Sequence, residues 1–394
     1  MARHGAGQGH GQARQVRDAT AANPAAQAGP EAQASRAQAS GAHAAGEHVP
    51  GRRRDAGGAG RDAPTLSDQH DLAPGAGTLL CRYAEALFWL ARYMERIENL
   101  ARILDVTDTF TRSGTDASAW RSVVQINSDE ARFDAAHPVA NATSVTAFYV
   151  LDRDNPNSIA ASIFQARENA RTLRPLISTE MWAQINMFYN RVRQLGPDDI
   201  AASRLSGLCA WLKEACQLHA GITEGTFFRD QGWAFYSIGK YMERGDQTTR
   251  LLDIKYHTLL PSVADVGSPV DLSQWNSVLR AAAGYHAFRR VYPRGMSAGS
   301  VAGFLLLNTS FARSLALCTW LMQFHLTQLR SGYGLRNASG PLERLDGLRG
   351  SLAERDIRQV IASGLHEFLD GVQQELSLLY ADIAAAFWEV TPGG

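Results

Sequence analysis

Residues 86–106 read ALFWLARYMERIENLARILDV, and residues 234–254 read AFYSIGKYMERGDQTTRLLDI. Eight of the 21 aligned positions are identical at an offset of 148 residues, including an uninterrupted Tyr-Met-Glu-Arg. Two unrelated segments of average composition would share about one or two identities over this length. The repeat therefore indicates that one element has been duplicated, and its apolar spacing of three and four residues predicts that this element is a helix.

Each copy has an apolar side and a charged side on a helical wheel. The charged sides consist of Arg92, Glu95, Glu98, Asn99 and Arg102 in the first copy and of Lys240, Glu243, Asp246, Gln247 and Arg250 in the second. One interpretation is a solvated face whose i,i+4 pairs add about 0.2–0.5 kcal/mol each. However, aromatic residues crowd both copies, and Glu-Arg recurs as an adjacent pair pointing about 100° apart. These features favour two central helices whose Glu and Arg side chains line a shared polar seam.

The same helical periodicity extends over residues 77–391, and no convincing hairpin signal interrupts it. Prolines leave long blocks free, as helices require. We therefore predict an all-α, multi-helix bundle over 77–391, with N-caps at Asn157, Ser178 and Asp271. The predicted helices lie near 78–111, 158–174, 179–195, 199–223, 229–257, 272–291, 311–331 and 342–390, the last with a break at Gly364.

Residues 1–76 differ in composition from the rest of the chain. They are rich in Ala, Gly, Gln, Arg and His and contain only two valines and two leucines. Such a segment buries too little apolar surface to offset the entropy of ordering, so we predict a disordered tail. A variable tail and an over-extended start codon both remain open as its origin.

The charge balance excludes a generic nucleic-acid binder, because 39 Lys and Arg residues match 39 Asp and Glu residues. Only three of the basic residues are lysines. This excess of arginine suits bidentate anion recognition, and it is also what a GC-rich coding sequence produces. The most apolar stretch, 301–322, contains Asn308 and Arg313, which argues against a membrane span. Four cysteines without a CxxC motif or a secretory signal predict reduced thiols in a cytoplasmic protein.

Five blocks of sequence, in order, resemble the alpha-E family of bacterial helical proteins with a Glu-Arg motif. They are LFWLARYMERIENLARILDV (87–106), SIFQARENARTLRPLIS (162–178), GWAFYSIGKYMERGDQTTRLLD (232–253), FLLLNTSFARSLALC (304–318) and GLHEFLD (364–370). Ala312 stands where the family pattern usually has proline, and Asn308 where it more often has an acidic residue. Members are typically encoded beside, or fused to, circularly permuted ATP-grasp proteins and transglutaminase-like proteins. The resemblance thus implies a component of an ATP-dependent pathway that forms or modifies peptide or amide bonds.

The predicted site combines glutamates as bases with arginines that hold a carboxylate or an acyl phosphate. Glu95 and Glu243 are the candidate catalytic residues. The candidate ligand-binding residues are Arg96, Arg102, Arg167, Arg171, Arg244, Arg250 and Arg313. Arg167 and Arg171, one helical turn apart, could clamp an anion or pair with a glutamate of the repeat. A non-enzymatic scaffold, whose Glu-Arg pairs only fix the bundle and whose surface docks an ATP-grasp or transglutaminase-like partner, remains the alternative.

Other motifs carry weaker chemical signals. Gly295–Gly299 matches G-x-S-x-G, but a loop that precedes a helix favours Ser297 as a cap over a nucleophile. The sequence contains neither a Walker A motif nor Glu-x-x-His, so we predict no P-loop nucleotide site and no ferritin-like metal pair. Cys209, Cys216 and His219 share a helical face without a fourth ligand, which favours core over zinc. His366 is a further candidate acid or base. We predict no metal and no cofactor.

Overall fold

The structure is a computed structural model that describes residues 79–112, 119–259 and 268–389. The tail predicted over residues 1–76 lies outside the described residues, as do the last residues of the predicted domain. Within the described residues the regular secondary structure is all helical, with fifteen α-helices, the short π-helix Gln328–Gly332, the short 3-10 helix Arg336–Ala338 and no strand. The predicted all-α class is therefore confirmed.

The helices form two successive halves with the same order of elements. The first half contains α1 (Cys81–Arg112), α2 (Ala119–Ile126), α3 (Glu130–Ala136), α4 (Ala142–Val150), α5 (Ile159–Thr172), α6 (Thr179–Val192) and α7 (Leu205–Thr226). The second contains α8 (Gln231–Leu259), α9 (Pro269–Ala281), α10 (Tyr285–Val291), α11 (Ala298–Leu307), α12 (Leu315–Thr327), α13 (Ser339–Ala353), α14 (Ile357–Ser363) and α15 (Leu365–Phe387). Each half is thus a long helix, three short helices, a helical pair and another long helix, with α14 added in the second half.

Matching caps show that the duplication extends beyond the Glu-Arg helix. Helices α4 and α11 both begin with a capping box, formed by Asn141 with Ser144 and by Ser297 with Ser300. Helices α5 and α12 both begin at a serine N-cap, Ser158 and Ser314. Each of these pairs of caps is separated by 156 residues. The sequence repeat detected over 21 residues is therefore the most visible part of a duplicated domain.

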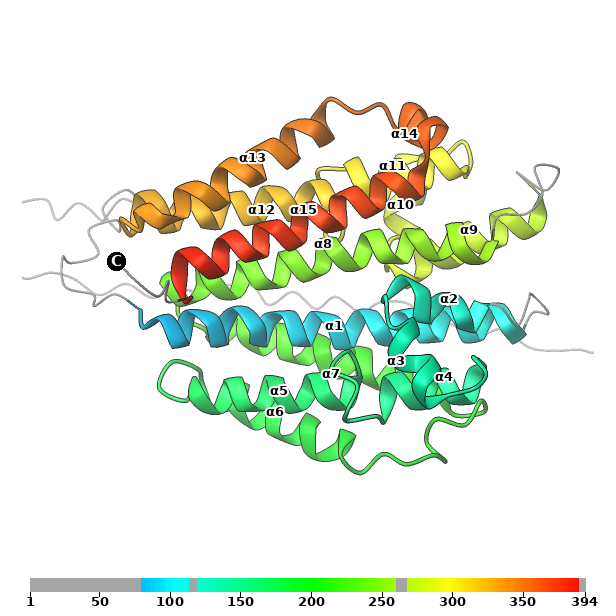
Figure 1. Cartoon of the computed structure of the whole chain (residues 1–394), viewed down its shortest axis with the longest axis horizontal. Coiled ribbons are helices and arrows are strands. Elements are labelled where there is room, and N and C mark those ends of the chain that lie inside the picture. The colour runs from blue at the N-terminus through cyan, green and yellow to red at the C-terminus, as the bar shows by residue number, and fades with distance from the viewer. Residues whose placement is uncertain (1–78, 113–118, 260–267, 390–394) are drawn as a thin grey trace, which may run out of the picture. The chain divides into compact units, whose positions relative to one another are not determined.

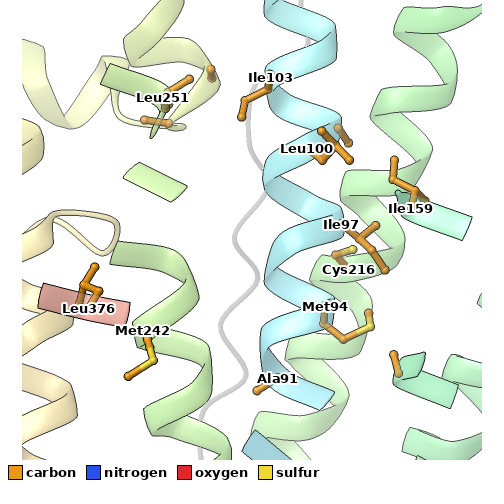
Figure 2. Close-up of a cluster of buried hydrophobic side chains, with 14 of the residues drawn as sticks. Ala91, Met94, Ile97, Leu100, Ile103, Ile159, Cys216, Met242, Leu251 and Leu376 are labelled. Carbon is orange, nitrogen blue, oxygen red and sulfur yellow. The ribbon is translucent and has the colours of Figure 1, made fainter. Parts of the chain in front are cut away.

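Helices α1 and α8 lie side by side between the remaining elements of the two halves (Figure 1). They run in the same direction, since Leu79 bonds to Gln231 near their first turns and Arg244 bonds to Glu95 further along both. Their apolar sides face the outer helices. In Figure 2, Met94 and Ile97 of α1 lie toward Cys216 of α7, and Met242 of α8 lies on the opposite side. The charged sides of the two central helices therefore meet each other.

The two central helices approach each other closely at Gly239, because a Cβ atom there would lie 2.2 Å from the carbonyl oxygen of Phe88. Its counterpart in the first repeat is Ala91, which is also buried and small. Small residues at this crossing let the backbones come close enough for the Glu and Arg side chains to reach across.

Several predicted boundaries were wrong. Residues 119–150 form three short helices that the sequence did not signal, and 272–291 is divided into α9 and α10. The N-caps are Ser158 and Ser268 instead of Asn157 and Asp271, whereas Ser178 is confirmed. The break at Gly364 is also confirmed, and this residue has a positive φ of 115°.

None of the described helices combines the length and the apolar character needed to cross a membrane.

Replacing Gly239 by alanine should destabilise the bundle by about 1–3 kcal/mol, because the added methyl overlaps backbone and not a movable side chain. Urea unfolding would measure this change. Gly221→Ala in α7 is the matched control, because an added Cβ there meets nothing within 4 Å. The control should be neutral or slightly stabilising. Equal stabilities for the two variants would contradict the close crossing.

Candidate functional site at the Glu-Arg seam

The two repeated Glu-Arg pairs exchange partners across the seam. Arg244 of α8 forms a bidentate pair with Glu95 of α1, with Nε 3.0 Å from Oε2. Reciprocally, Arg96 of α1 forms a bidentate pair with Glu243 of α8, at 2.8 and 3.2 Å. Both carboxylates are almost fully buried, at 6% and 1% exposure. The adjacent Glu and Arg of each copy therefore point in different directions because both are bound by the other copy.

A second pair of arginines links each central helix to the short helices of the other half. Arg102 binds Glu98 within α1 and donates to the carbonyl oxygen of Ala281, the last residue of α9, at 3.1 Å. Arg250 binds Asp246 within α8 and donates to the carbonyl oxygen of Ile126, the last residue of α2, at 2.5 Å. Cations are favourable at helix C-termini, where carbonyl groups lack partners.

The two halves differ at one position of the seam. In the second half, Arg313 extends from the residue before the N-cap of α12 and binds Glu98 at 2.6 Å and Asn99 at 3.1 Å. The residue 156 positions earlier is Asn157, which is too short to do this and instead donates to Asp129 at 3.0 Å. Asp129 is buried and also accepts a hydrogen bond from Tyr149.

A cavity of about 200 Å³ opens on the side of Asn157. Its charged lining consists of Arg92, Arg96, Glu243, Asp246 and Arg250, and Tyr380 and Ser377 of α15 cover it. Arg92 donates to Glu243 at 2.7 Å, and its guanidinium lies 4.7 Å from the ring of Trp89 and 5.4 Å from that of Tyr380. A polar space of this size holds several water molecules or a small polar ligand.

Arginines keep two buried carboxylates of the seam, Glu98 and Glu243, ionised. Burial alone would raise the pKa of Glu243, but Arg96 and Arg92 outweigh it and hold this pKa well below its usual range. Burial is likewise outweighed at Glu98, where Arg313 and Arg102 lower the pKa to about 2. Carboxylates in this state are weak bases. A role of Glu95 or Glu243 as a base stays a prediction, and it requires a ligand that displaces an arginine.

Two predicted ligand-binding residues lie away from the seam. Arg167 points to the α5–α6 side, where it bonds to Asn186 and Glu168, and its guanidinium lies 5.0 Å from the ring of Tyr189. The side chain of Arg171 is 67% exposed and pairs with Glu168. The apolar face of α5, with Ile163 and Ala166, packs inward, so both arginines face outward and do not join the seam.

The serine, cysteine and histidine candidates of the sequence lie in environments that favour structural roles. Ser297 caps α11, as expected. Burial raises the pKa of the Cys209 thiol to about 12, and it also raises that of Cys216. His219 is buried against Tyr236, and burial lowers its pKa to about 4. These thiols are protonated at neutral pH and the imidazole is neutral.

One group of side chains has the spacing of metal ligands. Asp253, His366 and Asp370 each place one potential ligand atom within 4.8 Å of the others. His366 Nδ1 lies 2.8 Å from Asp253, and this pairing outweighs burial and raises the pKa of His366. A hydrogen-bonded His–Asp pair therefore accounts for this contact.

The geometry of the seam agrees with a family defined by the same motif. The family model for Alpha-E, "a predicted alpha-helical domain with a conserved ER motif", matches residues 79–388. The chain belongs to the Alpha-E family. Its ER motif occurs twice, as Glu95-Arg96 and Glu243-Arg244, and the structure pairs the two copies reciprocally.

Curated relatives of this alpha-E protein come from mycobacteria. Uncharacterised proteins of Mycobacterium bovis (strain ATCC BAA-935 / AF2122/97) and Mycobacterium tuberculosis (strain CDC 1551 / Oshkosh) are each 26% identical to it over 350 residues. The match covers 81% of this chain and 38% of each relative, so the chain spans well under half the length of these proteins. No solved structure matches the chain.

Sequence reasoning missed several residues of the site, among them Arg92, Glu98 and Asn157. Arg92 and Glu98 were recognised only as part of a charged helix side, and Asn157 only as a possible cap. A signal for Asn157 was present, because LDRDNPNS (151–158) aligns with LNTSFARS (307–314) at an offset of 156. This alignment sets Asn157 against Arg313.

Acid should selectively remove the stabilisation that Glu98 provides. Its pKa of about 2 in the folded chain lies below the unfolded value of 4.5, so the contribution is complete above pH 4.5 and is lost as the pH falls toward 2. Glu98→Gln should lower the free energy of unfolding at pH 7, and the gap to the wild type should narrow by about 3 kcal/mol over that range.

Urea unfolding at a series of pH values would measure the gap. The control is Asp134→Asn, at an exposed pair with Arg121, where solvent screening keeps the change small. A wild-type to Glu98→Gln gap that stays constant between pH 5 and pH 2 would contradict the assignment.

Proposed function

We propose that this alpha-E protein binds a small carboxylate or acyl phosphate in the cavity between α1, α8 and α15. In this proposal it acts in the cytoplasm as a component of an ATP-grasp-dependent pathway that forms or modifies peptide or amide bonds. The proposed binding rests on the observation that Arg92, Arg96 and Arg250 all line the cavity. The pathway rests on the family resemblance, which associates alpha-E proteins with ATP-grasp and transglutaminase-like proteins.

Each of the three guanidinium groups keeps a donor for a ligand. Arg92 uses Nε for Glu243 and one terminal nitrogen for Met242. Arg96 uses Nε and one terminal nitrogen for Glu243, and Arg250 uses Nε for Asp246 and one terminal nitrogen for Ile126. The remaining terminal nitrogen of each group donates to no described residue. Planar forks held in fixed orientations are suited to bind carboxylate and phosphate oxygens.

The charges of the lining also favour an anion. Three arginines stand against the carboxylates of Glu243 and Asp246, so one positive charge remains. A monoanionic ligand would neutralise it without breaking the ion pairs that join the helices. The paired glutamates fix the arginines before the ligand arrives, which lowers the entropic cost of binding.

Arg92→Lys should weaken carboxylate binding at least tenfold and leave folding nearly intact, because lysine stands at the matching position, Lys240, in the second repeat. An ammonium keeps the charge but loses the planar fork. The measurement is calorimetric titration with a panel of free and N-acetylated amino acids, alongside thermal unfolding. Lys240→Arg, a change outside the cavity lining, is the matched control and should retain wild-type affinity. Equal binding by Arg92→Lys, or no binding by the wild type at millimolar ligand, would refute the proposal.

A non-enzymatic scaffold is the second candidate, and one observation favours it. Glu95 and Glu243 are both saturated by arginines of the opposite helix, as purely structural pairs would be. A scaffold should form a micromolar complex with an ATP-grasp partner, and the complex should survive Arg92→Lys. Absence of a complex in analytical ultracentrifugation would count against the scaffold.

A further inference from the structure

The seam contains two equivalent sets of side chains, one in each half. On the cavity side they are Glu243, Asp246, Gln247 and Arg250, and the matching residues 148 positions earlier are Glu95, Glu98, Asn99 and Arg102. Each set presents two carboxylates, one amide and one arginine in the same order along a helix. The second-half loop that approaches the Glu95 set ends in Arg313, whereas the first-half loop that approaches the cavity ends in Asn157.

Arg313 shows what the set around Glu95 binds. Its two terminal nitrogens donate to Glu98 at 2.6 Å and to Asn99 at 3.1 Å, and Glu95 lies 3.7 Å away. The backbone of Arg313 is also held, because Thr248 donates to its carbonyl oxygen at 2.7 Å. Arg313 is itself buried, at 9% exposure. A guanidinium is thus the natural occupant of this arrangement.

The set around Glu243 offers the same acceptors without an occupant from the chain. Gln247 is 6% exposed and lines the cavity, and its amide nitrogen donates to Glu243 while its amide oxygen accepts from no described residue. Asp246 accepts from one arginine, Arg250, whereas its counterpart Glu98 accepts from two, Arg102 and Arg313. Asn157 is turned to Asp129 and does not reach them.

Neighbouring arginines do not prevent a cation from binding here. Arg313 lies close enough to Arg102 and Arg244 for their charges to oppose its own, and it is nevertheless held by Glu98 and Asn99. With Arg92 and Arg96 counted on the cavity side, and their counterparts Lys240 and Arg244 on the other, each set carries one net positive charge before a guanidinium is added. The set around Glu95 therefore shows that this charge pattern accommodates a further guanidinium.

We propose that the cavity binds the guanidinium group of a ligand, with Asp246 and Gln247 in the roles that Glu98 and Asn99 have toward Arg313. The ligand class is an arginine-like amino acid or an arginine-bearing peptide end. This inference rests on the proposed function for its carboxylate half, which Arg92, Arg96 and Arg250 would bind. The assignment of the guanidinium site does not depend on the proposed function. It rests only on the comparison with the duplicated set of residues that binds Arg313.

Calorimetric titration of the full-length protein with L-arginine, L-citrulline and agmatine tests the two halves separately. L-Citrulline replaces the guanidinium by a neutral ureido group of the same shape and keeps the carboxylate. Agmatine keeps the guanidinium and lacks the carboxylate. We expect L-arginine to bind at least tenfold more tightly than L-citrulline. Equal affinities for those two, or no binding of L-arginine at millimolar concentration, would overturn the guanidinium assignment.

The comparison with agmatine separates this inference from the proposed function. Agmatine binding as tightly as L-arginine would refute the carboxylate site and leave the guanidinium site standing. If L-citrulline and L-arginine bind with equal affinity and neither binds to Arg92→Lys, the guanidinium site would be refuted and the carboxylate site would stand.

Asn157→Arg supplies the chain's own guanidinium and should abolish L-arginine binding by filling the cavity as Arg313 fills the equivalent place. Asn157→Ala loses the same hydrogen bond to Asp129 without adding a cation and should retain binding. Gln247→Met, a near-isosteric change, provides a second variant if Asn157→Arg does not fold, and it should weaken L-arginine more than L-citrulline. Undiminished L-arginine binding by folded Asn157→Arg would refute the placement.

Discussion

The structure depends on the reciprocal exchange of two buried Glu-Arg pairs between α1 and α8. Removing one partner of a buried pair costs about 3–5 kcal/mol, because the other charge is left in a medium that solvates it poorly. The exchange therefore fixes the register of the two helices: a shift by one turn would strand four charges at once. The close approach at Gly239 belongs to the same constraint, since larger residues there would move the guanidinium groups out of reach of their carboxylates.

Fixing the register also fixes the chemistry of the seam. Arginines held in place by buried carboxylates are rigid donors, and Arg92, Arg96 and Arg250 line the cavity. The same pairing keeps the pKa of Glu243 low, so this glutamate orients its arginines more readily than it accepts a proton. The cavity is accordingly better suited to hold a charged ligand than to abstract a proton from one.

The fold class was predictable from sequence because apolar spacing and the repeat of 86–106 are local signals. The same repeat placed Glu95, Arg96, Glu243 and Arg244 together, since duplicated helices with charged sides have few other ways to bury them. That Arg167 and Arg171 lie outside the seam was not predictable, because packing of residues such as Ile163 determines which face of the helix points inward. The short helices over 119–150 were missed because tertiary contacts, and not their own propensity, determine them.

The parallel arrangement of α1 and α8 gives this domain the geometry of a two-fold dimer contained in one chain, with each contact from one copy to the other matched by its reverse. In a dimer of identical chains, any change at the seam occurs in both places together. Joining the halves in one polypeptide removes that restriction. The two halves have accordingly diverged at one position. Arg313 fills the copy of the seam around Glu95, whereas Asn157 leaves the copy around Glu243 as an open cavity.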